Sequence, residues 1–368
     1  MTRSNRRDFL KRAGAVASGA ALGAGALVGC GKGDGGASTA GGGAAGGAAA
    51  TAASITHDLC VSKGGESIAQ LTRAAIDGLG GMAAFVSQGA TVCLKPNASW
   101  DRSPGIGATT HPDVFKELVL MCQEAGAGDI YAIDFPLASE PLVWNGLGPV
   151  AEEAGTEFII LTDTTDQMWE TMEFPDGVRV LPEMGEEQVA YDFLGADVVI
   201  NIPVLKSHSS TGVSIALKNL MGVIRDRGRY HGGGSGGYGT GGAEVSSDIH
   251  QAIADLGLML KDKVHLTLVD CTYVLTDESG PRGREDTPGE PMMTCIAGTD
   301  MVACDYRAAQ LFGLSDDQIS QVAAHIPLAA EIGAGTTDLA SLKLNEVDLG
   351  GGSGDEPEAT PETDEEAG

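Results

Sequence analysis

The chain has 368 residues, with 51 acidic against 23 basic side chains and a formal net charge of −28. Such an acidic surface repels nucleic acid and anionic lipid, which argues against a nucleic-acid-binding protein. The seven cysteines form no Cys-x-x-Cys pair, so an iron–sulfur or zinc-thiolate site has little support. Five of them lie inside apolar runs, where we expect small buried hydrophobic side chains: Cys93, Cys122, Cys271, Cys295 and Cys304.

The first 30 residues resemble a twin-arginine export signal that ends in a lipoprotein box. Adjacent Arg6 and Arg7 precede Phe-Leu-Lys, an Ala/Gly-rich stretch follows over residues 13–28, and Cys30 closes it. The stretch is too short and too weakly apolar for a stable membrane span. This order predicts export through the twin-arginine machinery and a lipid anchor on Cys30, at the periplasmic or outer face of a bacterial membrane. The alternative is an ordinary signal peptide with an incidental cysteine.

Composition divides the rest of the chain into three parts. Residues 31–54 are almost all Gly, Ala, Ser and Thr, which is typical of a flexible linker. Residues 350–368 are acidic, with prolines and no aliphatic cluster, and we expect them to be disordered. Residues 55–349 remain for the folded part, which is long enough for one large α/β domain or two lobes.

Strand-like and helix-like segments alternate along the folded part. Short apolar runs predict strands, and apolar residues at helical spacing predict helices between them. The alternation predicts an α/β fold with a largely parallel sheet and helices on both faces. The expected strands are 90–94, 129–133, 157–161, 196–202, 264–269 and 292–297, and the expected helices are 67–79, 113–125, 142–155, 214–223 and 301–311.

Polar side chains follow the carboxyl ends of several expected strands. In open parallel sheets, ligands bind at that edge. We therefore expect a site where the strands end. The residues that point to it are Lys95 and Asn97, Asp134, Lys206 and His208, and Asp270.

Residues 201–231 are the most informative stretch, because two Lys, three Arg and two His stand there against one Asp in an otherwise acidic protein. A local excess of positive charge favours a bound anion. Lys206 and His208 lie two residues apart just beyond a strand, and an extended backbone points both toward one side. His208 is then a candidate for proton transfer. The alternative is a histidine that only bonds the backbone of its loop.

Lys218 and Asn219 interrupt an apolar run. A lysine there is costly to bury unless it is paired or meets an anion, so Lys218 is a second catalytic candidate, and a lysine that reaches the surface is the alternative. Asn219 is a candidate to orient a carboxylate or to cap a chain end. Arg225 is the strongest ligand candidate among three alternating arginines, which an extended segment would present on one side; a basic surface that balances nearby acids is the alternative.

The remaining ligand candidates are His231, Lys95, Asn97 and His111. His231 opens a glycine run over Gly232–Gly242, which suits a mobile lid or a disordered insertion and is not a P-loop. Lys95 and Asn97 either contact a ligand or fix the next loop. The cofactor is unknown from the sequence. A metal remains open, held by histidines that meet an aspartate: His111, His208, His231 and His250 with Asp134 or Asp270.

Several motifs together resemble the domain-of-unknown-function 362 family across about residues 55–345. The resemblance implies a fold more than a reaction, because the activity of the family is unsettled. Many members carry a ferredoxin module with cysteine clusters, and this chain has none. The motifs are Leu94-Lys-Pro-Asn97, Thr110-His-Pro112, Asp134-Phe-Pro136, Asn201-Ile-Pro-Val-Leu-Lys-Ser-His208, Ala216-Leu-Lys-Asn-Leu-Met-Gly222, Leu268-Val-Asp270, Gly280-Pro281 and Asp300-Met-Val-Ala-Cys-Asp305.

A thinner similarity connects the chain to the nickel-pincer lactate racemases. That family places a lysine ten residues after a histidine and a second histidine further on, as His208, Lys218 and His231 do here. The resemblance implies that the lysine carries the pincer cofactor and that the histidines bind nickel or move a proton. The surrounding Gly-rich motif of that family does not match well.

The sequence therefore predicts an exported, lipid-anchored α/β protein that binds a small anionic ligand, a carboxylate or a phosphate, at the strand-end edge and does not bind nucleic acid. Lys206 and Arg225 are expected to hold the anion while His208 relays a proton. Two alternatives stay open: a non-catalytic solute-binding or assembly lipoprotein, and a cofactor-bearing enzyme such as a racemase or a redox protein.

Overall fold

The computed structural model of the chain describes residues 53–138, 141–231, 248–276 and 280–350. The export signal, nearly all of the linker, the Gly232–Gly242 run and the acidic tail lie outside these residues. Within the described part, ten strands form one sheet. They are β1 (Leu59–Lys63), β2 (Thr91–Pro96), β3 (Asp129–Asp134), β4 (Glu157–Ile160), β7 (Val198–Ile202), β8 (Val204–His208), β9 (Gly212–Ser214), β10 (Leu266–Leu275), β11 (Glu290–Gly298) and β12 (Leu344–Asp348).

The sheet is largely parallel, with the order β12-β1-β11-β10-β7-β2-β3-β4. Strands β10, β7, β2, β3 and β4 run parallel to one another, whereas β11 pairs antiparallel with both β10 and β1. Strand β8 continues the line of β7 alongside β10 and forms a short antiparallel pair with β9. The carboxyl ends of β2, β3 and β7 therefore meet at one edge.

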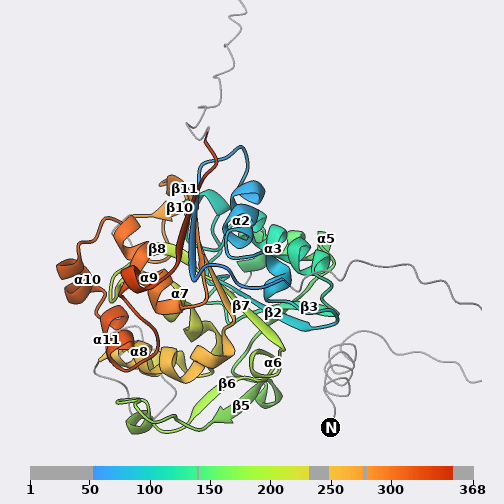
Figure 1. Cartoon of the computed structure of the whole chain (residues 1–368). Helices are drawn as coiled ribbons and strands as arrows, with labels where there is room; N and C mark the ends of the chain where they lie inside the picture. The colour runs from blue at the N-terminus through green and yellow to red at the C-terminus, as the bar shows by residue number, and fades with distance from the viewer. Residues whose placement is uncertain (1–52, 139–140, 232–247, 277–279, 351–368) are drawn as a thin grey trace, which may run out of the picture. The chain divides into compact units, whose positions relative to one another are not determined.

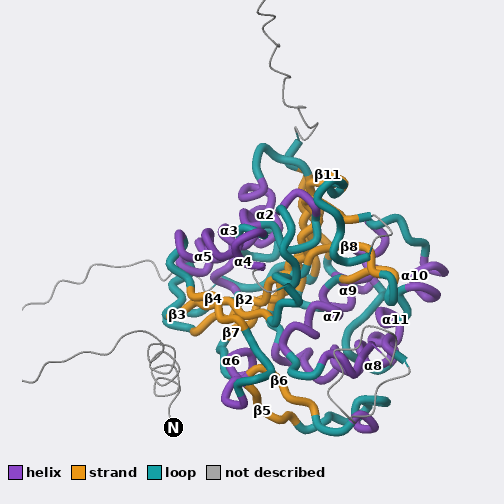
Figure 2. Tube along the Cα trace, turned by 180° about the vertical axis from the view of Figure 1, so that it is seen from behind, coloured by secondary structure: helices purple, strands orange, loops and turns teal. Residues whose placement is uncertain are grey.

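Helices cover both faces of the sheet (Figure 1). One face packs on α2 (Ile68–Asp77), α3 (Pro112–Glu124) and α5 (Leu147–Glu153), with the short α4 (Pro141–Trp144) beside α5. The other face packs on α8 (Ile249–Leu260), α9 (Met301–Leu311) and α11 (His325–Glu331), as the view from behind also shows (Figure 2). Side chains alternate between the two cores along β2, since Val92 and Leu94 face the first and Cys93 the second.

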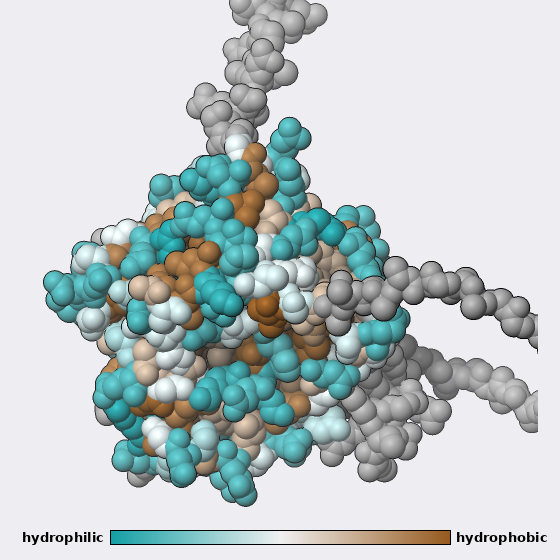
Figure 3. Space-filling view, in the orientation of Figure 1, coloured by the Kyte–Doolittle hydropathy of each residue, from teal (hydrophilic) through white to brown (hydrophobic). Residues whose placement is uncertain are grey.

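Smaller elements complete the second face. Helix α7 (Ala216–Asn219) packs on α8 and α9, and α10 (Asp316–Val322) precedes α11. A separate two-stranded sheet of β5 (Trp169–Met172) and β6 (Glu187–Ala190) lies below the main sheet with α6 (Tyr191–Leu194), in the orientation of Figure 1. The face seen in Figure 3 carries hydrophilic residues with smaller apolar areas between them.

The expected α/β class, with a largely parallel sheet and helices on both faces, is confirmed. All six expected strands are present, and the helix expected over 301–311 has these bounds in α9. The helix expected over 142–155 is wrong, because Gly146 adopts φ 78° and separates α4 from α5. The segment 204–208, expected to be extended just beyond a strand, is itself a strand, so Lys206 and His208 belong to β8.

All six cysteines of the described residues are buried free thiols, including the five expected to be buried. Burial raises the pKa of the Cys122 thiol to about 12, so this group stays protonated and behaves as a small apolar side chain. Across the same residues, none of the helices has the length and apolar character needed to cross a membrane.

Candidate functional site

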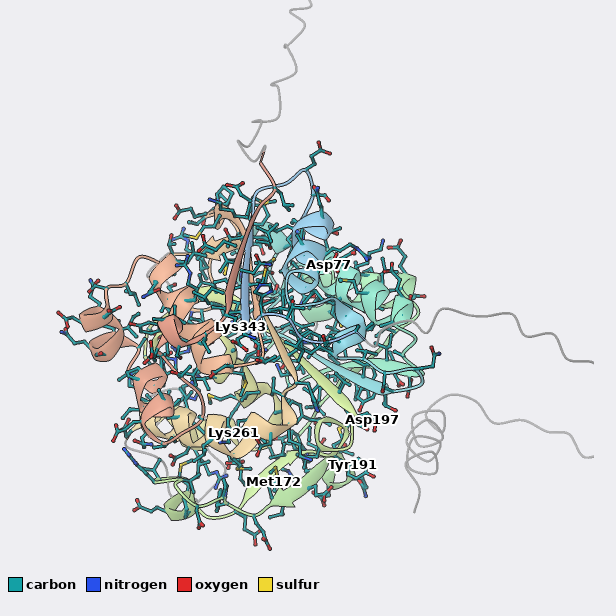
Figure 4. The ribbon with its side chains drawn as sticks, viewed as in Figure 1. Asp77, Met172, Tyr191, Asp197, Lys261 and Lys343 are labelled. Carbon is teal, nitrogen blue, oxygen red and sulfur yellow. The ribbon has the colours of Figure 1, made fainter. Side chains whose placement is uncertain are left out.

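A buried ion pair lies where β2 and β3 end. Lys95 Nζ is 2.8 Å from Asp134 Oδ1, and both side chains are at most 1% exposed. Lys95 is the register partner of Asn201 on β7, so three parallel strands deliver polar groups to one point. Figure 4 marks Asp197 just before β7 begins, which places the site at the opposite, carboxyl end of that strand. This is the edge at which parallel sheets bind ligands.

The Asn219 side chain joins the strand ends to α7. Its Oδ1 accepts hydrogen bonds from Lys95 Nζ at 3.3 Å and from Asn97 Nδ2 at 3.1 Å. Its Nδ2 donates to the Lys95 carbonyl at 3.1 Å and to Asn201 Oδ1 at 2.8 Å. The amide is therefore fully satisfied in a buried position, which fixes its orientation. We call Lys95, Asn97, Asp134, Asn201 and Asn219 the inner network.

Gly222 has no side chain, and the ion pair occupies the space where one would lie. A Cβ at this position would lie 2.2 Å from Asp134 Oδ1 and 2.7 Å from Lys95 Nζ. Any larger residue would therefore displace the pair. The Leu-Met-Gly sequence after Asn219 ends in glycine because the backbone at Gly222 comes too close to the two charged groups for a side chain to fit.

A buried carboxylate fixes the start of α7. Asp305 on α9 accepts hydrogen bonds from the backbone N–H groups of Ala216 at 2.7 Å and Leu217 at 3.0 Å. Burial raises the pKa of Asp305 to about 7, and these two hydrogen bonds oppose the shift. The carboxylate holds the turn from which Lys218 and Asn219 project.

Lys206 on β8 is the first of two buried lysines beside the inner network. Its Nζ donates to Asn97 Oδ1 at 3.3 Å and to the Ala108 carbonyl, and the residue is 2% exposed. Burial lowers the pKa of Lys206 to about 7; the nearby Asp134 opposes the shift, while Lys218 and Lys95 add to it. The amine is thus poised between its charged and neutral forms at neutral pH.

Lys218 on α7 is the second buried lysine. Its Nζ lies 2.8 Å from Met221 Sδ and 3.1 Å from His231 Nε2, and the residue is 8% exposed. Burial lowers the pKa of Lys218 to about 7, with a further contribution from Arg227. Among the described residues, the partners of this amine are a thioether and a neutral imidazole, which do little to stabilise its charge.

Two histidines lie next to Lys218, and both stay neutral. His231 Nδ1 is 3.2 Å from the Arg227 carbonyl, which can only accept, so Nδ1 carries the proton and Nε2 accepts from Lys218. His208 stacks on His231 with ring centroids 6.3 Å apart, and its Nδ1 accepts from the Ser210 N–H, so its proton lies on Nε2. Burial lowers the pKa of His231 to about 4 and that of His208 to about 2.

Lys206, Lys218, His208 and His231 form what we call the lysine–histidine cluster. Within the described residues, no carboxylate lies within salt-bridge distance of the Nζ atoms of Lys206 and Lys218. Asp134 is bound to Lys95 instead. The cluster therefore offers two amines and the His208 Nε2–H donor with no negative group of its own, an arrangement that suits an anion.

Two predicted ligand residues, Arg225 and His111, lie outside both the inner network and this cluster. Arg225 donates to the Asp163 carbonyl, to Asp166 Oδ1 at 2.6 Å and to Gln188 Oε1 at 2.9 Å. His111 precedes α3 as its N-cap, where its Nδ1 accepts from the Asp113 N–H.

The expectation that the three arginines share one side is also wrong. The segment Arg227–His231 is a 3-10 turn rather than an extended chain, so the guanidinium groups diverge. Arg227 donates to the Phe135 and Pro136 carbonyls and stacks over the Phe135 ring at 4.2 Å. Arg229 forms a buried ion pair with Glu187 at 3.1 Å.

Other residues of the site carried weaker signals in the sequence. Asn201 and Gly222 lie within the family motifs, but no local pattern shows that they contact Lys95 and Asp134. His325 is a single histidine at the start of a short helix, with no motif around it. Only the tertiary structure brings it near the cluster, by pairing it with His250 across α8 and α11.

The metal site that the sequence left open, made of histidines that meet an aspartate, finds no support in the geometry. Across residues 53–350, apart from the stretches that are not described, no three His, Cys, Asp or Glu side chains come together in a way that could hold a metal ion. The nickel-binding role that the racemase resemblance implies for His208 and His231 needs a lysine-bound cofactor as well as these side chains, and we derive no metal-dependent step.

The fold and the site together define an α/β protein with a buried, positively charged site at the carboxyl ends of a mostly parallel sheet. The family model described as "Domain of unknown function (DUF362)" matches residues 92–310, more than half of the chain. The protein belongs to this family. A curated relative, a thylakoid-associated protein of Synechocystis sp., is 30% identical over 154 residues. The match covers 41% of this chain and 44% of that protein, so less than half of either is compared.

Two solved structures are similar to the chain at a low level. A Thermotoga maritima protein is 14% identical with a TM-score of 0.41, over 67% of this chain and 58% of that one. The lactate racemase apoprotein of Thermoanaerobacterium thermosaccharolyticum is 12% identical with a TM-score of 0.41, over 70% of this chain and 57% of that one. These values are too low to assign an activity.

Replacing Gly222 by alanine tests the packing at the ion pair. We expect Gly222→Ala to lower the free energy of unfolding by about 3 kcal/mol, since overpacking costs about 1–3 kcal/mol and breaking a buried pair costs about 3–5 kcal/mol. Gly105→Ala is the control, because a Cβ there meets nothing within 4 Å. It should change stability by less than about 0.5 kcal/mol. Equal urea unfolding midpoints for the two variants would contradict the close approach.

Proposed function

We propose that the protein binds a small anion, a carboxylate or a phosphate, in the lysine–histidine cluster at the carboxyl ends of the sheet strands. Lys206 and Lys218 supply the positive charge, and the His208 Nε2–H supplies a neutral donor. Lys95 is not a ligand group in this proposal, because Asp134 already neutralises it. Asn97 orients the Lys206 amine from the inner network, and Asn219 holds Asn97 in place.

The absence of a carboxylate beside Lys206 and Lys218 in the described residues is the observation that carries this proposal. Burying an ammonium group without a counterion is unfavourable, and a structure normally avoids it unless a ligand supplies the charge. A bound anion would stabilise the charged amines and raise the pKa of both lysines. The neutral histidines add hydrogen-bonding groups without adding more positive charge to the site.

A catalytic role for Lys218 is the second candidate function. An amine with a pKa of about 7 is partly deprotonated at neutral pH, so it can accept a proton or attack a carbonyl carbon. The neighbouring His231 Nε2, which accepts from Lys218, offers a place for the proton. Turnover of a bound carboxylate or phosphate ester that is lost in Lys218→Met would make the protein an enzyme rather than a binding protein.

The proposal predicts that phosphate affinity falls as the pH rises above 7. Both lysines must be charged to hold the anion, so affinity should drop up to about tenfold per pH unit for each lysine involved. Burial lowers both pKa values; Asp134 opposes the shift of Lys206 while Lys218 and Lys95 add to it, and Arg227 adds to the shift of Lys218. Phosphate itself becomes more negative over pH 6–9, so weaker binding must come from the protein. Isothermal titration calorimetry measures both the affinity and the accompanying proton uptake.

Lys218→Met tests the same proposal at one residue. We expect it to weaken phosphate binding at pH 6 at least about tenfold, since it removes one of two charges. Lys343→Met is the control, because Lys343 is exposed and lies just before β12 (Figure 4). Lys218 also affects stability, because its pKa near 7 in the folded protein lies below its value of 10.5 in the unfolded chain. Burial of the charged amine lowers the free energy of unfolding below pH 7, and this cost disappears as the pH rises from 7 to 10.5. Unchanged binding in Lys218→Met would refute the site.

We also propose that the protein is exported by the twin-arginine machinery and anchored through a lipid on Cys30. The order of Arg6, Arg7, the apolar stretch and Cys30 in the sequence supports this. In a bacterial host, the protein should sediment with membranes and begin at a lipidated Cys30 by mass spectrometry. Cys30→Ala should remove the lipid anchor and release the protein from membranes. The double substitution Arg6→Lys and Arg7→Lys should block export, whereas the control Arg3→Lys should not. An unmodified N-terminus at Met1 would contradict the proposal.

A further inference from the structure

A second pair of histidines lies close to the lysine–histidine cluster. His250 is in the first turn of α8, and His325 begins α11; their rings stack with centroids 5.5 Å apart and their Nδ1 atoms are 3.3 Å apart. His325 is completely buried, and its Nε2 has no hydrogen-bond partner among the described residues. A buried polar atom without a partner costs free energy, so its presence requires an explanation.

The hydrogen bonds fix the tautomer of His325. His250 Nδ1 accepts from the backbone N–H of His325 at 3.2 Å, so this nitrogen carries no proton. The contact between the two Nδ1 atoms then requires His325 Nδ1 to be the donor. Burial lowers the pKa of His325 to about 3, which keeps the ring neutral. His325 Nε2 therefore carries no proton and can only accept a hydrogen bond, and no donor reaches it among the described residues.

The helices around His325 also pack against the segments that hold Lys218 and His208 of the lysine–histidine cluster. A Cβ on Gly257 of α8 would lie 2.5 Å from the side chain of Leu217, so α8 packs tightly on the turn that carries Lys218. A Cβ on Gly212, the strand partner of His208, would lie 2.6 Å from the Val322 carbonyl, which precedes α11. Lys218 influences the pKa of His325, and His325 influences that of His208. His325 therefore lies near Lys218 and His208 of the cluster.

We propose that His325 Nε2 accepts a hydrogen bond from an O–H group of the bound anion, so that the site selects protonated oxyanions such as hydrogen phosphate over fully deprotonated ones such as sulfate. This inference rests on the proposed anion site and specifies its ligand class. The lysines and His208 donate to the charged oxygens, and His325 accepts from the remaining O–H. Sulfate has nearly the same shape but no proton at neutral pH, so it would face the His325 lone pair with its own lone pairs.

Binding of inorganic phosphate and sulfate at pH 6.5, measured by calorimetry on the full-length protein, tests this inference. We expect phosphate to bind at least about tenfold more tightly than sulfate, because a site built to pair an O–H rejects the analogue that lacks it. The ratio should fall toward one in His325→Leu. The His250→Phe variant keeps a stacked ring and removes the Nδ1 acceptor, so His325 can shift its proton to Nε2, and the ratio should fall there too.

The control is His57→Phe, since His57 bonds only its neighbour Thr56 in the exposed segment before β1. It should leave the ratio unchanged. Equal binding of phosphate and sulfate by the wild-type protein would overturn the role of His325 while leaving the anion site intact. A preference that persists in a folded His250→Phe or His325→Leu variant would also overturn it. No binding of either anion would refute the anion site itself, and the selectivity with it.

Discussion

The burial of positive charge without enough negative charge is the constraint on which the rest of the structure depends. Three lysines, Lys95, Lys206 and Lys218, are buried around the end of β2, and Asp134 is the carboxylate that forms an ion pair there in the described residues. One charge is thus neutralised inside the protein, and two are not. Desolvation holds both remaining amines near pKa 7, which makes their charge state sensitive to any ligand that approaches.

The fold maintains this unfavourable arrangement with rigid, fully bonded surroundings. Parallel strands bring Lys95, Asn201 and Asp134 to one edge, and the Asn219 amide ties them to α7 with four hydrogen bonds. Asp305 holds the start of α7. Such preorganisation is typical of binding and catalytic sites, where the cost of placing charges is met during folding rather than when the ligand binds.

Much of the fold could be predicted from the sequence, because buried parallel strands are continuous apolar runs with clear ends. The expectation that ligands bind at the carboxyl ends of parallel strands also gave the correct edge of the sheet for Lys95, Asn97 and Lys206. Strands β1 and β12 have no such signal, since their pairing depends on segments far away in the chain, and β9 has only three residues. The break at Gly146 was missed because a helical pattern continues on both sides of it.

The site could be predicted only in part, because charge patterns show which residues are candidates but not which neighbours they meet. Arg225 and Lys218 looked alike as cations in a basic stretch. Asp163, Asp166 and Gln188 hold Arg225, whereas Lys218 meets Met221 and His231. His325 has no motif around it, and it is identified by its buried Nε2, which has no hydrogen-bond partner within the described part of the chain.

The pKa values of the buried lysines are the most direct test of the central claim. NMR titration of isotopically labelled lysine side chains, assigned with Lys206→Met and Lys218→Met, measures them in the intact protein. Two amines should titrate near pH 7 in the free protein and near or above pH 8 when phosphate is saturating. Titration of both amines near 10.5 in the free protein, with no response to any anion, would contradict the account.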